Sequence, residues 1–476
     1  MKKRGKIGRC LLIGAALLTS VYSYAQDNQK YSDNSWTPTV FSPLEGIQWV
    51  EQCVDQHPEI LWLADSHVQK TEEGLANLDA SYSEQLFGQK YVEFDRTITS
   101  IHCLKLILDG SDEAYQIFTA SQPTDVKLSR ESFGALHRQA QELLKSQWQG
   151  MSQLQVAQAM ETVVVLGDIG KSDKARDLFK PYGIQAPDHD DFYGEAVQII
   201  LQHPTLCPSF SSLSTTAKQL LVKTAKLAHY GHITHLEGGP VMFDPLKESA
   251  IASKDPIALS FDLFVYTCDV AGALGHVNHQ TSLVYTEPTH QAMQAMVEAV
   301  KVLSNPSKTQ MDAYNSYLSV RASWLGLDAS VHSDRVLSRI GAMLRLFTIE
   351  EGLMLRKAFH ELDLANRNQI QTELDDHHQD LDRRTPTYMP AVLVNLSNNP
   401  ALGKTKEERL TQAIIIGLPF IARVLERHRK MLLKKEVDSR FPLNFNRVAG
   451  IVKTSPHSLG GKFSIDREGT VHLVFE

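Results

Sequence analysis

Hydrophobic residues recur every three or four positions over most of this chain, which is the pattern of amphipathic helices. We expect one helix from about Ser129 to Gly150 and a second from Ser152 to Leu166. Gln155 stands three residues after Ser152, the spacing of a capping box, so the second helix has a defined start. Its last part contains three consecutive valines, which also fit a strand. The apolar face that begins two turns earlier favours a helix.

The same pattern predicts helices along the rest of the chain, while its end differs. Residues 462–475 alternate around a turn at 466–469, which predicts a β hairpin. The other predicted helices cover residues 44–53, 100–108, 214–236, 256–277, 333–362 and 406–435. We therefore expect a mainly α fold with a short β hairpin tail. Its expected parts are a signal peptide (1–25), an N-terminal region (26–125), a helical domain (126–300), a C-terminal helical region (301–435) and a β tail (436–476).

The first 25 residues have the composition of a secretory signal peptide. Five basic residues precede the apolar run Cys10–Leu18, and Ser23-Tyr24-Ala25 offers small residues for cleavage. Cleavage there would change the formal net charge from −7 to −12, which argues against a nucleic-acid groove. No later stretch is apolar enough to span a membrane. We expect a periplasmic or secreted protein, and the sequence leaves the choice between these open.

The cysteines of the exported chain follow no metal-binding or redox motif. They are Cys53, Cys103, Cys207 and Cys268, and none belongs to a C-x-x-C pair. In an oxidising compartment one or two disulfides would form. We expect Cys53 to pair with Cys103, since both lie in the N-terminal region.

Two carboxylates lie in strongly apolar surroundings. In VVVLGDIGKSD, residues 163–173, Asp168 and Lys171 follow a wholly apolar run, and Asp269 lies within FDLFVYTCDVAGAL. A carboxylate in an apolar environment costs several kcal/mol unless a partner, a metal or a proton compensates it. The sequence therefore predicts a buried polar site that includes both aspartates.

Histidines on the neighbouring predicted helices could complete a metal site there. His229 and His232 are three residues apart and can share a helix face, and His137 lies on the first strong helix. Imidazoles and carboxylates are the usual ligands of zinc, iron and manganese. A bound divalent metal would activate water to attack a phosphate ester, with Lys171 contacting the phosphate.

These residues resemble the HD-domain metallophosphohydrolase superfamily, whose hallmark is H…HD…D and one large branch of which carries HDIGK. The resemblance covers roughly residues 130–285 and implies an HD-domain-like helical core. By this pattern His137 would be the first metal ligand, Asp168 the aspartate of the HD pair, Lys171 the lysine of that branch and Asp269 the last ligand. The extra ligands of members that hold two metals would be His189 or Asp190, and His229 or His232.

The chain departs from that pattern at Gly167, which stands where the family has a histidine. A mononuclear site would thereby lose one of its four ligands. Three functions follow: an exported metal-dependent phosphohydrolase, a catalytically degenerate HD-like binding or scaffolding protein, and a non-haem iron oxygenase on the same fold. Each residue also has a purely structural interpretation. Asp168 could pair with Lys171, and Asp269 could accept a buried hydrogen bond.

Overall fold

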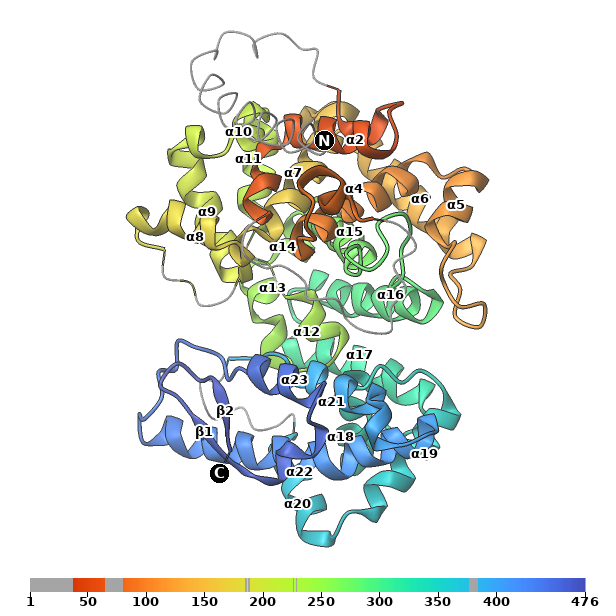
Figure 1. The fold of residues 1–476 in the computed structure, drawn as a ribbon, viewed down its shortest axis with the longest axis vertical. Coiled ribbons are helices and arrows are strands. Elements are labelled where there is room, and N and C mark those ends of the chain that lie inside the picture. The colour runs from red at the N-terminus through yellow and green to blue at the C-terminus, as the bar shows by residue number, and fades with distance from the viewer. Residues whose placement is uncertain are drawn as a thin grey trace, which may run out of the picture. The chain divides into compact units, whose positions relative to one another are not determined.

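The computed structural model describes residues 37–64, 80–184, 186, 189–225, 227, 229–375 and 384–475, and of residues 189 and 190 the backbone only. The chain divides into two compact units, residues 1–226 with 257–291, and residues 227–256 with 292–476. Both are mainly helical (Figure 1), and one antiparallel hairpin lies near the C-terminus, so the predicted fold class is confirmed. The region expected as one helical domain, residues 126–300, is shared between the two units.

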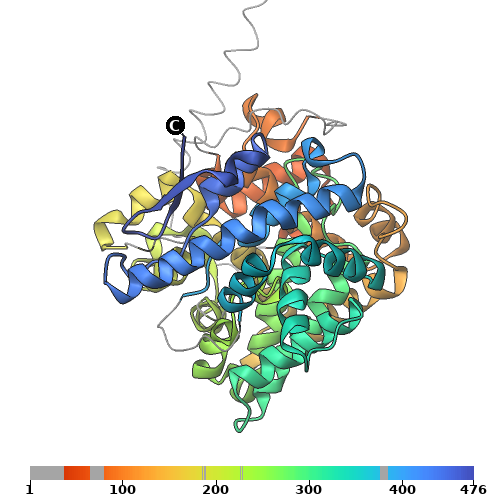
Figure 2. The ribbon, with the colours of Figure 1, turned by 90° about the horizontal axis from the view of Figure 1, so that it is seen from below.

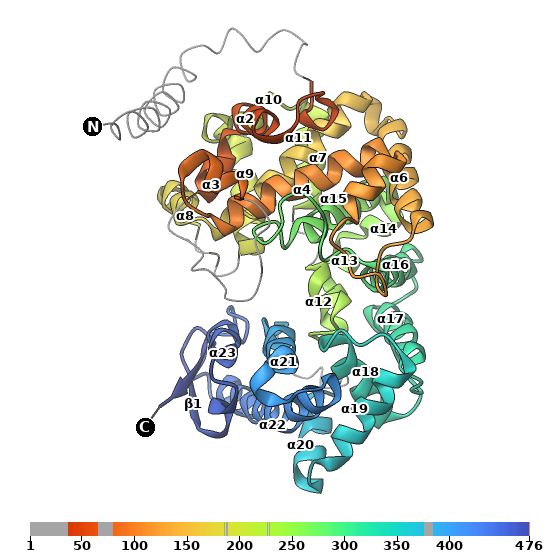
Figure 3. The same cartoon turned by 45° about the vertical axis from the view of Figure 1, so that its right-hand side comes forward.

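The first unit is built around three helices, α4 (Val92–Asp109), α7 (Gln153–Gly167) and α15 (Pro256–Gly272), which lie at its centre in Figure 3. Phe94 and Ile98 of α4, Val165 of α7 and Phe264 of α15 are all fully buried. Around these helices lie α2 (Gly46–Gln56), α3 (Tyr82–Phe87), α5 (Asp112–Phe118), α6 (Arg130–Lys145), α8 (Asp173–Phe179), α9 (His189–Gln202), α10 (Pro208–Ser212) and α11 (Thr215–Thr224), with 3-10 turns that include η2 (Thr39–Phe41), η3 (Pro58–Leu63) and η5 (Ile169–Lys171).

A buried carboxylate on α7 joins the N-terminal segment to this centre. Glu161 is fully buried and accepts hydrogen bonds from Thr39 Oγ1 at 3.0 Å and from the Val40 backbone N–H at 2.6 Å. Its other oxygen lies 3.2 Å from His57 Nε2. These three contacts satisfy a carboxylate that would otherwise be costly to bury, and they hold residues 39–57 against α7.

The second unit is organised by a long helix, α22 (Lys406–Leu433), which Figure 2 shows passing across it. Buried Leu and Ile side chains of α22 pack against α19 (Ile349–Glu361), α20 (Leu364–Glu373) and α21 (Met389–Asn398). The hairpin pairs β1 (Lys462–Ile465) with β2 (Val471–Val474), and Ile465 is opposite Val471. The other elements are α12 (Tyr230–Thr234), α13 (Asp244–Ser249), α14 (Ile251–Lys254), α16 (Glu287–Lys301), which begins in the first unit, α17 (Gln310–Trp324), α18 (His332–Met343) and α23 (Asn446–Val452).

Most predicted helices are present, but two are interrupted. The capping box of Ser152 and Gln155 is formed, and the valines after it are helical. The predicted helix 214–236 is wrong as one element: the chain leaves α11 after Thr224 and begins α12 at Tyr230. The predicted helix 333–362 is likewise two helices, because Arg345 takes a left-handed conformation (φ 57°) between α18 and α19.

The sequence predicts no membrane-spanning segment after residue 25, and the hydropathy of the described helices agrees with this prediction. Within the described ranges, no helix combines the length and the apolar composition needed to cross a bilayer.

Candidate functional site

The stretch DIGK forms a tight turn at the end of α7. Asp168 caps the helix, and a single 3-10 turn, η5, follows, in which the Lys171 N–H donates to the Asp168 carbonyl at 3.0 Å. Ser172 then starts α8 by accepting a hydrogen bond from the Ala175 N–H and donates to the Trp62 carbonyl at 2.6 Å. This turn places the side chains of Asp168 and Lys171 on the same side, one helical turn apart.

An ion cluster forms where this turn meets the start of α4. Lys171 Nζ lies 2.7 Å from Asp168 Oδ1 and 3.3 Å from Glu93 Oε2. Arg96 Nη1 lies 3.0 Å from the other oxygen of Glu93. The side chains are 11–23% exposed, so the cluster is mostly buried but reaches solvent. Paired charges in such a position compensate one another's desolvation.

Asp269 on α15 is the fifth member of the ion cluster. Burial, and after it the neighbouring Arg96, would lower the pKa of Lys171. The charges of Asp168, Glu93 and Asp269 outweigh both influences, so the pKa is raised. Burial is also the largest influence on Arg96, yet Glu93, Asp168 and Asp269 raise its pKa. Both cations therefore stay charged at neutral pH. Both cations thus lie under the influence of three carboxylates.

Within the described part of the chain, Asp168 is paired with a cation of the protein itself. Among the residues that the structure describes, no group of three His, Cys, Asp or Glu side chains is placed to bind a metal ion. Lys171 already forms ion pairs with the carboxylates of Asp168 and Glu93. A second cation, Arg96, pairs with the same Glu93. A divalent ion would have to displace one of these charges against the repulsion of the other.

His137 is not brought to Asp168. Its Nδ1 lies 2.9 Å from the Ile107 carbonyl, and its ring packs on Gly110, where a Cβ would overlap it. Ile107 is eleven residues beyond Arg96 on α4, a rise of roughly 16 Å along the helix. The structure therefore gives His137 the role of a partly buried contact between α6 and the end of α4. His189 begins α9, and its side chain is outside the described residues.

His229 and His232 belong to the second unit, so the structure does not place them with Asp168. Their rings are 5.2 Å apart, and His232 Nδ1 lies 2.6 Å from Glu237 Oε2. The other Glu237 oxygen accepts the Met389 N–H at 2.8 Å. His235 is near them, and burial followed by Arg345 and Arg321 lowers its pKa well below the usual value. This group ties α12 to α21 and keeps one imidazole neutral.

Glu93 and Arg96 are the members of the ion cluster that sequence reasoning missed. They form an ordinary i,i+3 pair on α4, a pattern that surface helices also show. They differ from a surface pair because Glu93 also forms an ion pair with Lys171 in the turn after α7. Glu93 and Lys171 are more than 70 residues apart in the sequence. Of the residues that the sequence singles out, Asp168 and Lys171 form an ion pair, and the charge of Asp269 acts on Lys171.

The predicted disulfide between Cys53 and Cys103 is wrong. All four cysteines of the described chain are buried free thiols. Burial, aided by the Glu161 charge, raises the pKa of Cys53 even though Thr39 opposes it, and burial alone raises that of Cys103. These thiols are structural residues of the first unit's core as long as they stay reduced.

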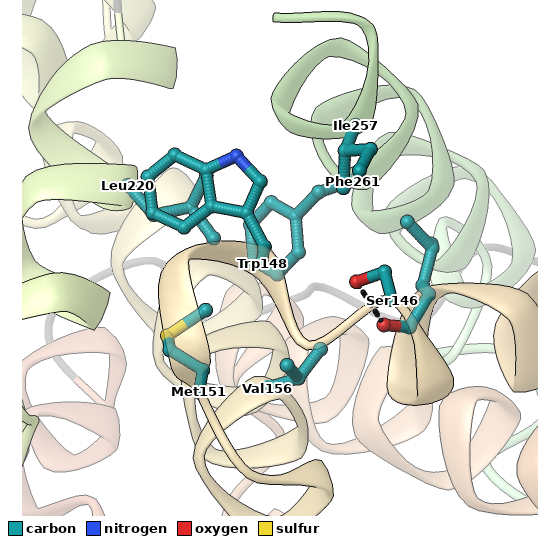
Figure 4. A pocket seen from close by; sticks show the side chains of 8 residues that line it. Ser146, Trp148, Met151, Val156, Leu220, Ile257 and Phe261 are labelled. Atoms are coloured by element: carbon teal, nitrogen blue, oxygen red, sulfur yellow. Dashed lines mark hydrogen bonds between the residues drawn. The ribbon is translucent and has the colours of Figure 1, made fainter.

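Two hollows lined by described residues make weaker candidate sites. The crevice in Figure 4 has about 10 Å³ of free volume, space for about one water molecule. Its lining includes Trp148, Leu220 and Phe261, and the hydrogen bond drawn there joins Ser146 Oγ to the Leu143 carbonyl at 2.7 Å. A larger open hollow of about 580 Å³ lies at the start of α22, where Thr405 and Glu408 already cap the helix.

The fold and site thus define a mainly helical protein with a mixed-charge cluster in its first unit. Residues 54–444 match the model of DUF6829, a family of unknown function, and the chain belongs to this family. No curated protein matches the chain, and no solved structure does.

Proposed function

We propose that this protein is a metal-independent binding protein, a degenerate relative of the HD fold, whose ligand contacts the ion cluster of Glu93, Arg96, Asp168, Lys171 and Asp269. The observation that carries the proposal is the position of Lys171 Nζ, within 3.3 Å of two carboxylates, one of which, Asp168, the HD pattern assigns to the metal. The meeting of Asp168, Lys171 and Asp269 supports the resemblance to that superfamily. The distance of His137 and the glycine at position 167 support the loss of its metal chemistry.

The chemistry of the ion cluster favours a small polar ligand with hydroxyl or amino groups. The carboxylates offer acceptors, and their negative charge disfavours a phosphate ester or another polyanion. Arg96 Nε is buried and has no acceptor among the described residues, so it adds one free donor. A ligand that combines several donors with one acceptor would satisfy these groups without displacing Lys171.

Two predictions from the sequence remain proposals, namely export and the metal-dependent hydrolysis of a phosphate ester. Export rests on the basic and apolar pattern of residues 1–25 and is tested by cell fractionation with N-terminal sequencing. Metal-dependent hydrolysis of a phosphate ester remains the competing function, because Asp168 and Asp269 belong to one cluster. It predicts that manganese, iron or zinc stabilises the protein, which the binding proposal does not.

A thermal-shift screen tests both functions on the same purified chain. Sugars, polyols, amines, amino acids and phosphate esters are screened first, each with and without added manganese, iron or zinc. Compounds that raise Tm are then titrated by calorimetry into the wild type, Asp168→Asn and the control Asp125→Asn, whose carboxylate is exposed.

We expect a polar, non-phosphate ligand that binds at least tenfold more weakly to Asp168→Asn and unchanged to Asp125→Asn. Equal binding to all three chains would place the ligand elsewhere. Metal-dependent stabilisation together with release of phosphate from an ester would establish the hydrolase instead.

A further inference from the structure

Helices α4 and α15 of the first unit touch through small residues. A Cβ on Gly272 would overlap the Oγ and the backbone N of Ser100, and one on Gly275 would overlap Thr99 Oγ1. The Ser100 hydroxyl also lies 3.5 Å from the Asp269 carbonyl. The two backbones therefore approach closely at Ser100.

The order of these contacts sets the direction of the two helices. From Gly275, just beyond the end of α15, back to Gly272 and Asp269 on the helix, the partners on α4 pass from Asp95 and Thr99 to Ser100. The helices are therefore antiparallel at the crossing.

One turn from the crossing, each helix carries a buried cysteine. Cys103 follows Ser100 by three residues, and Cys268 precedes Gly272 by four, so both keep to the faces that meet. Because the helices are antiparallel, both thiols are displaced toward the same side of the crossing. Burial and then the neighbouring Cys103 raise the pKa of Cys268, which agrees with two adjacent thiols. Both residues are fully buried.

We propose that Cys103 and Cys268 form a redox-active pair that oxidation converts to a disulfide between α4 and α15. Because the two backbones approach closely one turn away, we infer that the Cα atoms of Cys103 and Cys268 can reach the roughly 4.4–6.8 Å that a disulfide requires. In the reaction the two thiols lose two protons and two electrons and form one S–S bond. A low-molecular-weight disulfide such as oxidised glutathione accepts both electrons and protons and leaves as two thiols.

The bond would lock the two helices beside the ion cluster. Arg96 lies on the same face of α4 as Ser100 and Cys103, and Asp269 directly follows Cys268. Because both thiols are buried and remain protonated, they react slowly in the folded protein and readily while the chain folds. The pairing replaces the expected partner of Cys103, Cys53, with Cys268, and it does not depend on the proposed function.

The test is refolding of the full chain from denaturant in a glutathione redox buffer. Free thiols are alkylated under denaturing conditions, and the unreduced protein is digested with trypsin and chymotrypsin for mass spectrometry. Cleavage after Arg96 and Lys105 isolates residues 97–105, and cleavage after Tyr266 frees the peptide that holds Cys268. We expect these two peptides to be joined, with two fewer free thiols than in the reduced sample.

Matched variants separate this pair from chance oxidation. Cys268→Ala should lose the crosslink and leave Cys103 alkylated, while Cys53→Ala should keep it. If Cys268→Ala does not fold, the wild type still decides, since its oxidised form should melt several degrees above its reduced form. Full alkylation of every cysteine in the oxidised sample, or a crosslink that contains Cys53, would overturn the proposal.

Discussion

Lys171 Nζ lies 2.7 Å from Asp168 Oδ1, so the lysine that the HD-domain pattern assigns to phosphate is already paired with the aspartate that the pattern assigns to metal. Glu93 Oε2 forms an ion pair with the same ammonium group at 3.3 Å, and Arg96 Nη1 lies 3.0 Å from Glu93 Oε1. The carboxylates are thus compensated by the chain's own cations. Under the proposed function, the ligand would bind this site through hydrogen bonds and charge, without a metal ion.

Removal of the Lys171 cation should destabilise the first unit. Lys171→Met leaves the Asp168 and Glu93 carboxylates close together without their shared partner, and we expect a loss of about 1–3 kcal/mol in the free energy of unfolding. Urea denaturation followed by circular dichroism measures it. Lys145 is exposed, and Lys145→Met should stay within about 0.5 kcal/mol. Equal stability of Lys171→Met and the wild type would mean that the ion cluster is solvated and contributes nothing.

Loss of the Glu161 carboxylate should release the N-terminal segment. Glu161→Ala leaves the donors of Thr39, Val40 and His57 buried without their acceptor, at a cost of about 3–5 kcal/mol. Hydrogen exchange of residues 39–57 should then accelerate more than that of α22 in the second unit. Glu142 is exposed, and Glu142→Ala provides the comparison. Unchanged protection of residues 39–57 in Glu161→Ala would contradict the role given to this carboxylate.

Acid should destabilise the protein through His102. Burial, then Lys105 and His279, lowers its pKa from 6.5 to about 4. Between pH 6.5 and pH 4 the unfolded chain binds a proton at this site that the folded chain does not, so stability falls as pH falls. The contribution is about 3 kcal/mol at most. His102→Phe keeps a ring beside Trp49 and should flatten the dependence of Tm on pH in this window. An identical pH profile for the variant and the wild type would exclude the effect.

Two glycines of the first unit should respond oppositely to alanine. A Cβ on Gly272 overlaps the Ser100 backbone, so Gly272→Ala must separate α4 from α15 and should cost about 1–3 kcal/mol. A Cβ on Gly167 meets nothing within 4 Å, and Gly167→Ala at the end of α7 should stabilise by up to about 1 kcal/mol. Thermal unfolding of both variants checks the pair. Similar melting of the two would contradict the close crossing.

Local signals made the helices and the hairpin predictable. The Ser152 capping box and the alternation of residues 462–475 act within a few residues, and both appear as expected. The break between Thr224 and Tyr230 was missed because the apolar period continues through it. At this point the chain leaves the first unit and enters the second, and no local sequence pattern marks that boundary.

The site was predictable only where burial was readable from the sequence. Asp168 and Asp269 stood out because each lies in an apolar run, and the charges of both act on Lys171. Glu93 and Arg96 lie at the start of α4 with nothing apolar to mark them, and their contact with Lys171 depends on the tertiary fold. His137 has metal-ligand chemistry, but its ring contacts Ile107 at the far end of the same helix.

The most direct test of metal-independent binding is elemental analysis of the purified chain after incubation with manganese, iron and zinc and removal of unbound metal. Wild type, Asp168→Asn and Gly167→His are measured side by side; the last restores the histidine of the HD pair at a position with open space. We predict far less than one metal ion per chain in all three, because Lys171 continues to hold Asp168. About one metal ion per wild-type chain, lost in Asp168→Asn, would contradict the account and establish a metal centre.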